Sequence, residues 1–265
     1  MFKFYLASLL MIMAGPVEGF ADTPSPITYC RSLFHTVVQQ PDSNGGWIAT
    51  TSNNENKLCL YGSLSDIDLA YFKKTITNID KIDVIVRSSG GPVETWLTVA
   101  ELLSHKVHEL TVDELCFSSC ANYIVPIARQ ITSGPNSLIA WHGGPYMPKS
   151  SRTDGFCSLA DHNCLALARR TEVLYKKHNI SSDLLRVSGT VPHHKKYRSL
   201  ISTLANMQLL DSSMPLPVAG YAFSPDRLKA YGIHSTSRMW HAGADIDIAL
   251  LSLRRNQNLL LMESP

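Results

Sequence analysis

Apolar residues along the chain fall into short runs separated by polar turns, an order typical of α/β proteins. Between 65 and 79 they recur with helical spacing, and aspartates stand in the first turn, which predicts a helix. The run at 82–86 is typical of a buried strand, and SSGG at 88–91 of a tight turn. A second helix is expected at 93–103. These residues therefore form a strand, turn and helix unit.

The same order returns farther along the chain. The segment 107–112 resembles a strand, CFSSC at 116–120 forms a turn, and the apolar stretch 121–129 is expected to be a core helix. A further strand at 137–141 then ends on His142 and two glycines. Repeated units of this kind predict a parallel sheet covered by helices.

Two short strands, at 47–51 and 57–64, are expected ahead of these units. The chain shows neither an internal repeat nor a low-complexity linker, and 45% of its residues are hydrophobic, enough for one sizeable core. We therefore expect a single domain over 22–265.

The chain opens with the three parts of a secretory signal peptide. A lysine near the start is followed by an apolar stretch at 4–14, and small residues end at Ala21, where cleavage is expected. A membrane anchor is the alternative, but the stretch is shorter than the about 20 residues that span a bilayer. No later stretch is long and apolar enough to span. We expect a periplasmic or secreted protein with no stable membrane span after cleavage.

Six cysteines are an even number, and an oxidising compartment lets disulfides persist. Cys157 and Cys164 flank a short polar loop and suit a local pair. The other connectivity is open. The spacings match no four-ligand zinc site, so no metal is expected. Cys116 and Cys120 bracket two serines, either in disulfides or as buried thiols, with a structural role in both cases.

The formal net charge of +2 carries no nucleic-acid signature, so we expect no nucleic-acid partner. The dense basic run HHKKYR at 193–198 is typical of a solvated loop or helix end.

Three successive strands of the predicted sheet end on groups that suit acyl transfer: the pairs Gly90-Gly91 and Ser118-Ser119, and His142. Ligands of open α/β sheets gather at the carboxyl ends of strands, so we expect these groups to converge. A serine hydroxyl needs a base such as imidazole to become a nucleophile. Amides at a helix start and in a glycine turn stabilise an oxyanion. Taken singly, Ser119 also suits a helix cap and His142 a core position.

The segments VIVRSSGGPVE, CFSSCANYIVPIA and GPNSLIAWHGG, in this order, resemble the successive active-site segments of the Clp protease proteolytic subunit and its exported relatives in the Clp/crotonase superfamily. The likeness continues through RRTEVLYKKHNISSDLL and FSPDRLKAYGI and covers 82–233. It implies a Clp/crotonase-type core of repeated ββα units with a parallel sheet. It also implies a serine peptidase that acts on a peptide or protein without a cofactor, and a homo-oligomer as a hypothesis.

Carried over residue by residue, the resemblance implies Ser119 as nucleophile and His142 as general base. It places the oxyanion hole at the backbone N–H groups of Gly91 and Cys120. Ser118 competes with Ser119, because the loop to the histidine is shorter than in the proteases and the gap can be placed in more than one way. We favour Ser119.

The chain departs from the family at the acid. The proteases carry an aspartate just ahead of the segment that matches FSPDRLKAYGI, whereas the matching position here falls near Gly220. Asp211, in an apparent insertion, is a candidate for the missing acid. The hypotheses are therefore an exported serine hydrolase and a catalytically inactive peptide-binding or scaffold protein. An acyl-CoA enzyme of the crotonase type is a third, against which export argues.

Overall fold

The computed structural model describes residues 25–39, 43–52, 55–146, 157–190, 195–210, 217–234, 236, 239, 245–255 and 259–263. The predicted signal peptide and Asp211 lie outside these residues. Across the described part of the chain, none of the helices combines the length and apolar character that a bilayer crossing requires.

Within the described residues, eight strands form one sheet in the order β1-β2-β3-β4-β6-β7-β8, and β5 pairs with β4. The strands are β1 Gly46–Ser52, β2 Glu55–Tyr61, β3 Ile82–Ser88, β4 Val107–Phe117, β5 Gln130–Ser133, β6 Leu138–Trp141, β7 Val218–Ala222 and β8 Leu259–Glu263. All pairs are parallel except β1 with β2 and β6 with β7. The predicted α/β class is confirmed, but the sheet is mixed, because β1 and β2 form a hairpin and β7 enters beside β6 in the opposite direction.

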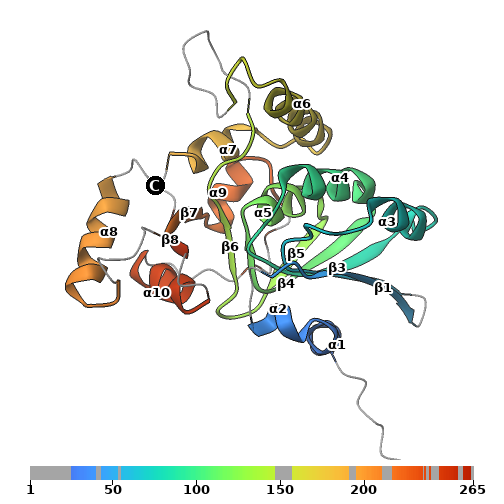
Figure 1. Cartoon of the computed structure of the whole chain (residues 1–265), viewed down its shortest axis with the longest axis horizontal. Coiled ribbons are helices and arrows are strands. Elements are labelled where there is room, and N and C mark those ends of the chain that lie inside the picture. Colours follow the sequence, from blue (N-terminus) through green and yellow to red (C-terminus); the bar gives the residue numbers. More distant parts are fainter. Residues whose placement is uncertain are drawn as a thin grey trace, which may run out of the picture.

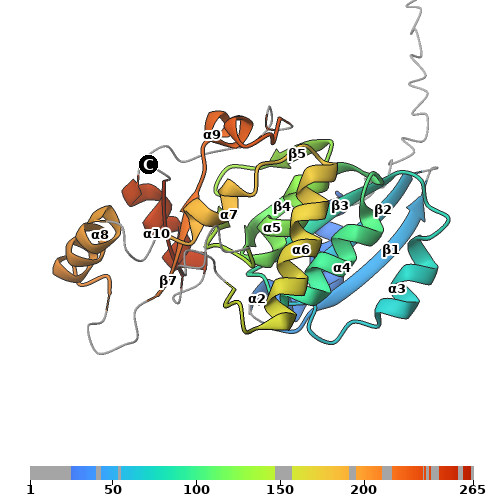
Figure 2. The ribbon, with the colours of Figure 1, turned by 90° about the horizontal axis from the view of Figure 1, so that it is seen from above.

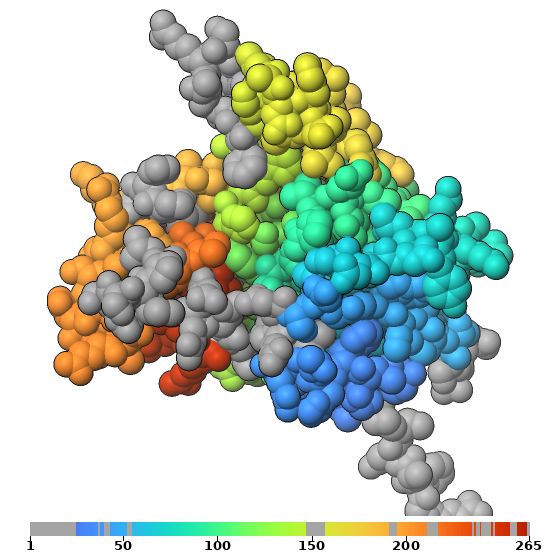
Figure 3. All heavy atoms as spheres, in the orientation of Figure 1, coloured from blue at the N-terminus to red at the C-terminus, as the bar shows by residue number. Residues whose placement is uncertain are grey.

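Helices cover both faces of the sheet. The helical segments are α1 Pro26–Leu33, α2 His35–Gln39, α3 Leu69–Ile76, α4 Val93–Leu103, α5 Ser119–Tyr123, η1 Val125–Ile127, α6 His162–Lys177, α7 Asp183–Ser188, α8 Lys195–Asn206, α9 Pro225–Ala230 and α10 Asp245–Arg255. Helices α3, α4 and α5 lie on one face, and α1 and α2 lie on the other (Figures 1 and 2). Figure 3 shows the blue to green segments of the first half beside the orange and red segments of the second half.

The predicted β3 and α4 are confirmed, and the helix expected at 65–79 forms over α3. The helix expected at 121–129 is wrong. Helix α5 ends at Tyr123, a 3₁₀ turn follows, and the chain enters β5. Pro126 explains the break, because its missing N–H and its ring interrupt helical hydrogen bonding.

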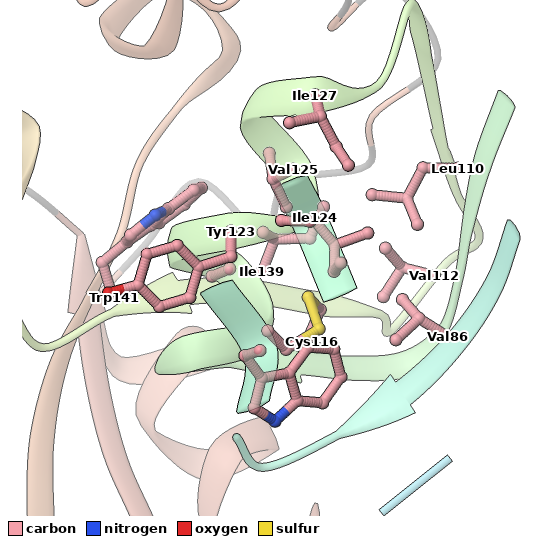
Figure 4. Packing of buried hydrophobic residues seen from close by; sticks show 14 of the residues in the cluster. Val86, Leu110, Val112, Cys116, Tyr123, Ile124, Val125, Ile127, Ile139 and Trp141 are labelled. Carbon is pink, nitrogen blue, oxygen red and sulfur yellow. A yellow bond between two sulfur atoms is a disulfide. The ribbon is translucent and has the colours of Figure 1, made fainter. Parts of the chain in front are cut away.

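The core beneath α5 anchors the end of β4. Tyr123, Ile124 and Val125 are fully buried and pack against apolar side chains of β3, β4 and β6, among them Val86 and Val112 (Figure 4). Burying each large apolar side chain contributes about 1.5–3 kcal/mol. A helix as short as α5 is therefore held by its packing rather than by its own propensity.

Strand β4 changes partner along its length. Residues 109–112 pair with β5, and residues 115–117 pair with β6. Between them the register with β3 shifts, and Glu114 adopts a φ of 72°. An irregularity of this kind bends a strand and turns its last residues in a new direction. The redirected stretch is the one that delivers the serine pair.

Side chains from the opposite face of the sheet hold this irregularity. Asp113 is 2% exposed and accepts hydrogen bonds from Tyr61 Oη at 2.7 Å and from Arg31 Nε at 2.9 Å. Glu114 pairs with Arg31 at 2.9 Å and with Arg87 at 2.6 Å. Because the buried carboxylate of Asp113 and the half-buried one of Glu114 are both paired, the network fastens α1 to β4 instead of leaving an isolated charge.

Three disulfides join Cys30 to Cys59, Cys116 to Cys120, and Cys157 to Cys164. The local pair expected between Cys157 and Cys164 is confirmed. Disulfides persist in oxidising compartments, so these three fit an exported protein.

Candidate active site

Ser118 and His142 meet at the carboxyl ends of neighbouring strands. Ser118 follows β4, His142 follows β6, and the Ser118 Oγ lies 2.6 Å from the His142 Nε2. The Ser118 N–H donates to the carbonyl of Ala140 at 3.2 Å, which continues the pairing of the two strands up to the site. A serine hydroxyl at this distance can pass its proton to the imidazole.

Ser118 occupies a strained corner. Its φ of 59° and ψ of −125° fall in a region that residues with a side chain rarely adopt. Its carbonyl accepts the N–H of Asn122 at 2.8 Å, and the disulfide between Cys116 and Cys120 closes the corner. A serine on a sharp turn from strand to helix is the arrangement that exposes a nucleophile above a sheet.

Ser119 faces away from His142. It is 2% exposed, and its hydroxyl donates to the carbonyl of Gly91 at 2.9 Å. The favoured pairing of Ser119 with His142 is therefore replaced by Ser118 with His142. The backbone explains the difference, because the corner lies at residue 118 and residue 119 already begins α5.

The glycine pair packs directly against this corner. Gly90 has a φ of 101°, and a Cβ placed on it would lie 2.6 Å from the Ser118 Cβ. Both the conformation and the close approach therefore require glycine. The Gly90 N–H donates to the Ser88 Oγ at 2.9 Å. Among the described residues the Gly91 N–H has no hydrogen-bond acceptor, so it is the amide of this turn that remains available to a ligand.

The imidazole of His142 is kept neutral by its surroundings. Burial lowers its pKa from the ordinary value, and a hydrogen bond between the ring and the residue's own backbone opposes this only in part. A neutral ring at pH 7 is the form that accepts a proton from a hydroxyl. Among the described residues, no carboxylate forms an ion pair or a hydrogen bond with this ring.

An aromatic ring lies beside Gly220, the position that the resemblance matches to the acid of the proteases. The antiparallel register of Trp141 with Tyr221 places Gly220 opposite His142. A Cβ on Gly220 would lie 2.7 Å from the Phe117 Cε2, and the Phe117 ring packs against His142 with centroids 5.0 Å apart. The space from Gly220 toward the imidazole is thus taken by Phe117, which sequence reasoning missed. The other candidate acid, Asp211, lies outside the described residues.

Asn122 is a further residue that the sequence did not reveal. It is 1% exposed, and its Nδ2 donates to the carbonyl of Gly143, directly after His142, at 2.8 Å. Its own carbonyl accepts the Tyr175 hydroxyl at 2.9 Å. Helix α5 therefore holds both sides of the site, the serine through its backbone and the histidine segment through Asn122.

Cys120, expected as an oxyanion donor, lies in the first turn of α5 and is bonded to Cys116. The first N–H groups of a helix have no intrahelical acceptor. With the corner at Ser118, the amide that directly follows it is that of Ser119.

Comparison with models of known families finds no match to this chain, and comparison with curated proteins finds none either. The likeness to the Clp protease proteolytic subunit accordingly stays a prediction from the quoted motifs.

Proposed function

We propose that the protein is an exported serine hydrolase, a peptidase resembling the Clp protease proteolytic subunit, with Ser118 as nucleophile and His142 as base. The observation that carries the proposal is the 2.6 Å contact between the Ser118 Oγ and the His142 Nε2 at a strained strand end. The order of the glycine, serine and histidine segments along the chain supports it.

In the proposed reaction, the His142 Nε2 takes the hydroxyl proton while the Ser118 Oγ bonds to the acyl carbon. The carbonyl electron pair moves onto oxygen, where the N–H groups of Gly91 and Ser119 are the proposed donors, the latter in place of Cys120. His142 then protonates the leaving amine or alcohol, and the acyl group stays on Ser118. A water molecule, deprotonated by His142, releases the acid and restores the serine.

The lack of a described carboxylate beside His142 shapes the expected rate. Loss of the orienting acid lowers turnover by roughly 10⁴-fold in serine proteases that have one. Because the base is not oriented by a described acid, we expect the rate to depend mainly on how readily the leaving group departs. We expect activated esters to react faster than peptides, with no cofactor in the reaction.

The test is labelling of the folded mature protein by a fluorophosphonate probe, which bonds covalently to an activated serine. We expect wild-type labelling, and its loss in both Ser118→Ala and His142→Ala, because one removes the nucleophile and the other its base. Ser119→Ala should still label at Ser118, as mass spectrometry of the labelled peptide would show. Labelling that survives in Ser118→Ala would reject the assignment.

A catalytically inactive peptide-binding or scaffold protein is the second candidate. The ring of Phe117 beside His142, in the place of a carboxylate, favours it. This candidate predicts a folded wild-type protein that no fluorophosphonate labels and that still binds peptides.

The Clp/crotonase-type core, a periplasmic or secreted location and assembly into homo-oligomers belong to the same proposal. Five parallel strand pairings and three disulfides support the first two. Self-association rests on the resemblance alone.

A further inference from the structure

Ser119 has a hydroxyl that the proposed reaction does not use. This hydroxyl is buried and joins the serine corner to the glycine turn, 28 residues earlier, through the carbonyl of Gly91 at 2.9 Å. We propose that Ser119 is a positioning residue, which fixes the Gly91 N–H as an oxyanion donor relative to the Ser118 Oγ. The inference rests on the proposed function.

The peptide that carries the Gly91 N–H is anchored on its carbonyl side. The Ser88 hydroxyl is fully buried and accepts the Gly90 N–H at 2.9 Å. Its single proton is shared between two carbonyl acceptors, that of Gly62 at 2.6 Å and that of Gly90 at 3.2 Å. The C=O and N–H of a trans peptide point in opposite directions, so the Gly91 N–H points away from Ser88.

The next peptide, which joins Gly91 to Pro92, is held by Ser119. Pro92 has no N–H, and within the described residues the Ser119 hydroxyl is the only donor to the Gly91 carbonyl. On the other side, a Cβ on Gly91 would lie 2.1 Å from the carbonyl oxygen of Ser63. Gly91 is therefore held between Ser63 and Ser119. Without the hydroxyl, a glycine with wide backbone freedom loses one of these restraints.

Restraint of this amide matters because an oxyanion donor works only within about 2.7–3.1 Å of the developing charge. Removing a whole donor lowers kcat by about 10²–10³-fold. Loosening a donor that remains in place should lower it less, by about 10-fold. Substrate binding before the reaction does not use this amide, so KM should change little.

The experiment measures hydrolysis of p-nitrophenyl acetate and the rate of fluorophosphonate labelling. Ser119→Ala should lower kcat and the labelling rate by about 10-fold with little change in KM. Ser119→Thr keeps the hydroxyl and should recover most of the rate. The matched control is Ser137→Ala, since Ser137 is also buried and donates to a backbone carbonyl, that of Val112 at 3.3 Å. The control should keep the wild-type kcat.

The outcomes separate the two proposals. A wild-type protein that neither labels nor hydrolyses the ester overturns both. Wild-type labelling together with an unchanged kcat in Ser119→Ala overturns the positioning role alone. Should Ser119→Ala fail to fold, Ser119→Cys preserves the shape with a weaker donor and must show the same loss of kcat. A fall in kcat that Ser137→Ala shares would also count against the role, because it would reflect stability.

Discussion

The imidazole of His142 combines partial burial with contact to a hydroxyl, and both affect how the site responds to acid. Because burial lowers its pKa, the ring stays unprotonated at pH values where an exposed histidine carries a proton. A base is useful only in its unprotonated form.

We therefore expect labelling of Ser118 to persist below pH 6.5, the ordinary histidine pKa, and to fall only as the pH drops through the lowered value. The rate of fluorophosphonate labelling between pH 4 and 8 gives the midpoint. Phe117→Ala should move the midpoint up toward 6.5, because it admits water to the ring. A wild-type midpoint above 6.5 would contradict the burial of His142.

At this scale the sequence predicted His142, Gly91 and a serine of the pair as partners, since each follows a recognisable strand. It did not predict which serine, because the choice depends on the backbone angles of Ser118. Nor did it predict Phe117, whose place beside His142 depends on the register of β4 with β6, in which Phe117 pairs with Ala140. Contacts across a register have no local signal in the chain.

Helix α5 is too short to be stable alone, so its position depends on what ties it down. The disulfide between Cys116 and Cys120 joins the end of β4 to the first turn of α5, with a sequence separation of 4. The other short-range bond joins Cys157, which precedes α6, to Cys164 in the first turn of α6, with a sequence separation of 7. Because it is similar in span but lies outside the serine corner, it serves as a control for the first bond.

The double variant Cys116→Ala/Cys120→Ala should have a free energy of unfolding that is lower by about 2 kcal/mol, the loss expected for so short a loop. It should also label about 10-fold more slowly, because the strained corner at Ser118 loses its brace. Cys157→Ala/Cys164→Ala should lose similar stability and label at the wild-type rate. Urea unfolding and labelling kinetics check both. Equal labelling by the two variants would show that the bond does not support the site.

Elements with a clean pattern were predicted well, and elements set by tertiary pairing were not. Helix α4 begins and ends where expected, at 93–103, because its glycine turn and its apolar spacing are local. The stretch 124–129, expected to complete a helix, instead leads through a 3₁₀ turn into β5, because an apolar run does not settle its structure by itself. The irregularity at Glu114 was not foreseen, because it exists only where β4 passes from β5 to β6.

The whole molecule should lose stability in mild acid. His178, at the end of α6, has its pKa lowered to about 4, first by burial and then by the charges of His105 and Lys177. The unfolded chain binds this proton near pH 6.5, whereas the folded chain does not. Stability is therefore full above pH 6.5 and falls as the pH drops toward 4. His142 contributes in the same direction.

Urea unfolding at several pH values between 4 and 7.5 would measure this slope. His178→Gln should flatten the curve in part, because glutamine can still bond to the Ser104 hydroxyl, which lies 2.9 Å from the His178 Nε2, and does not titrate. His35→Gln serves as the control, since His35 is exposed and its ring bonds to Gln39 of the same helix at 3.3 Å, and it should leave the slope unchanged. A pH-independent wild-type stability would refute the argument.

On the scale of the chain, the hydrophobic pattern was enough for an α/β fold, and the parity of the cysteines was enough for disulfides. The second half was less predictable. Strands β7 and β8 follow long segments with little pattern, and β7 runs against β6, which the repeated units did not suggest. The parallel order holds from β2 through β4, where a helix follows each strand.

The glycine opposite His142 limits the routes by which this chain can change. An aspartate introduced at Gly220 would collide with the Phe117 ring and with the Leu261 Cδ2, each 2.7 Å from the position of its Cβ. Shrinking Phe117 first would strip the imidazole of its neighbour before any carboxylate arrived. From Gly220, a carboxylate can therefore approach the imidazole only if the Phe117 ring moves or is replaced at the same time.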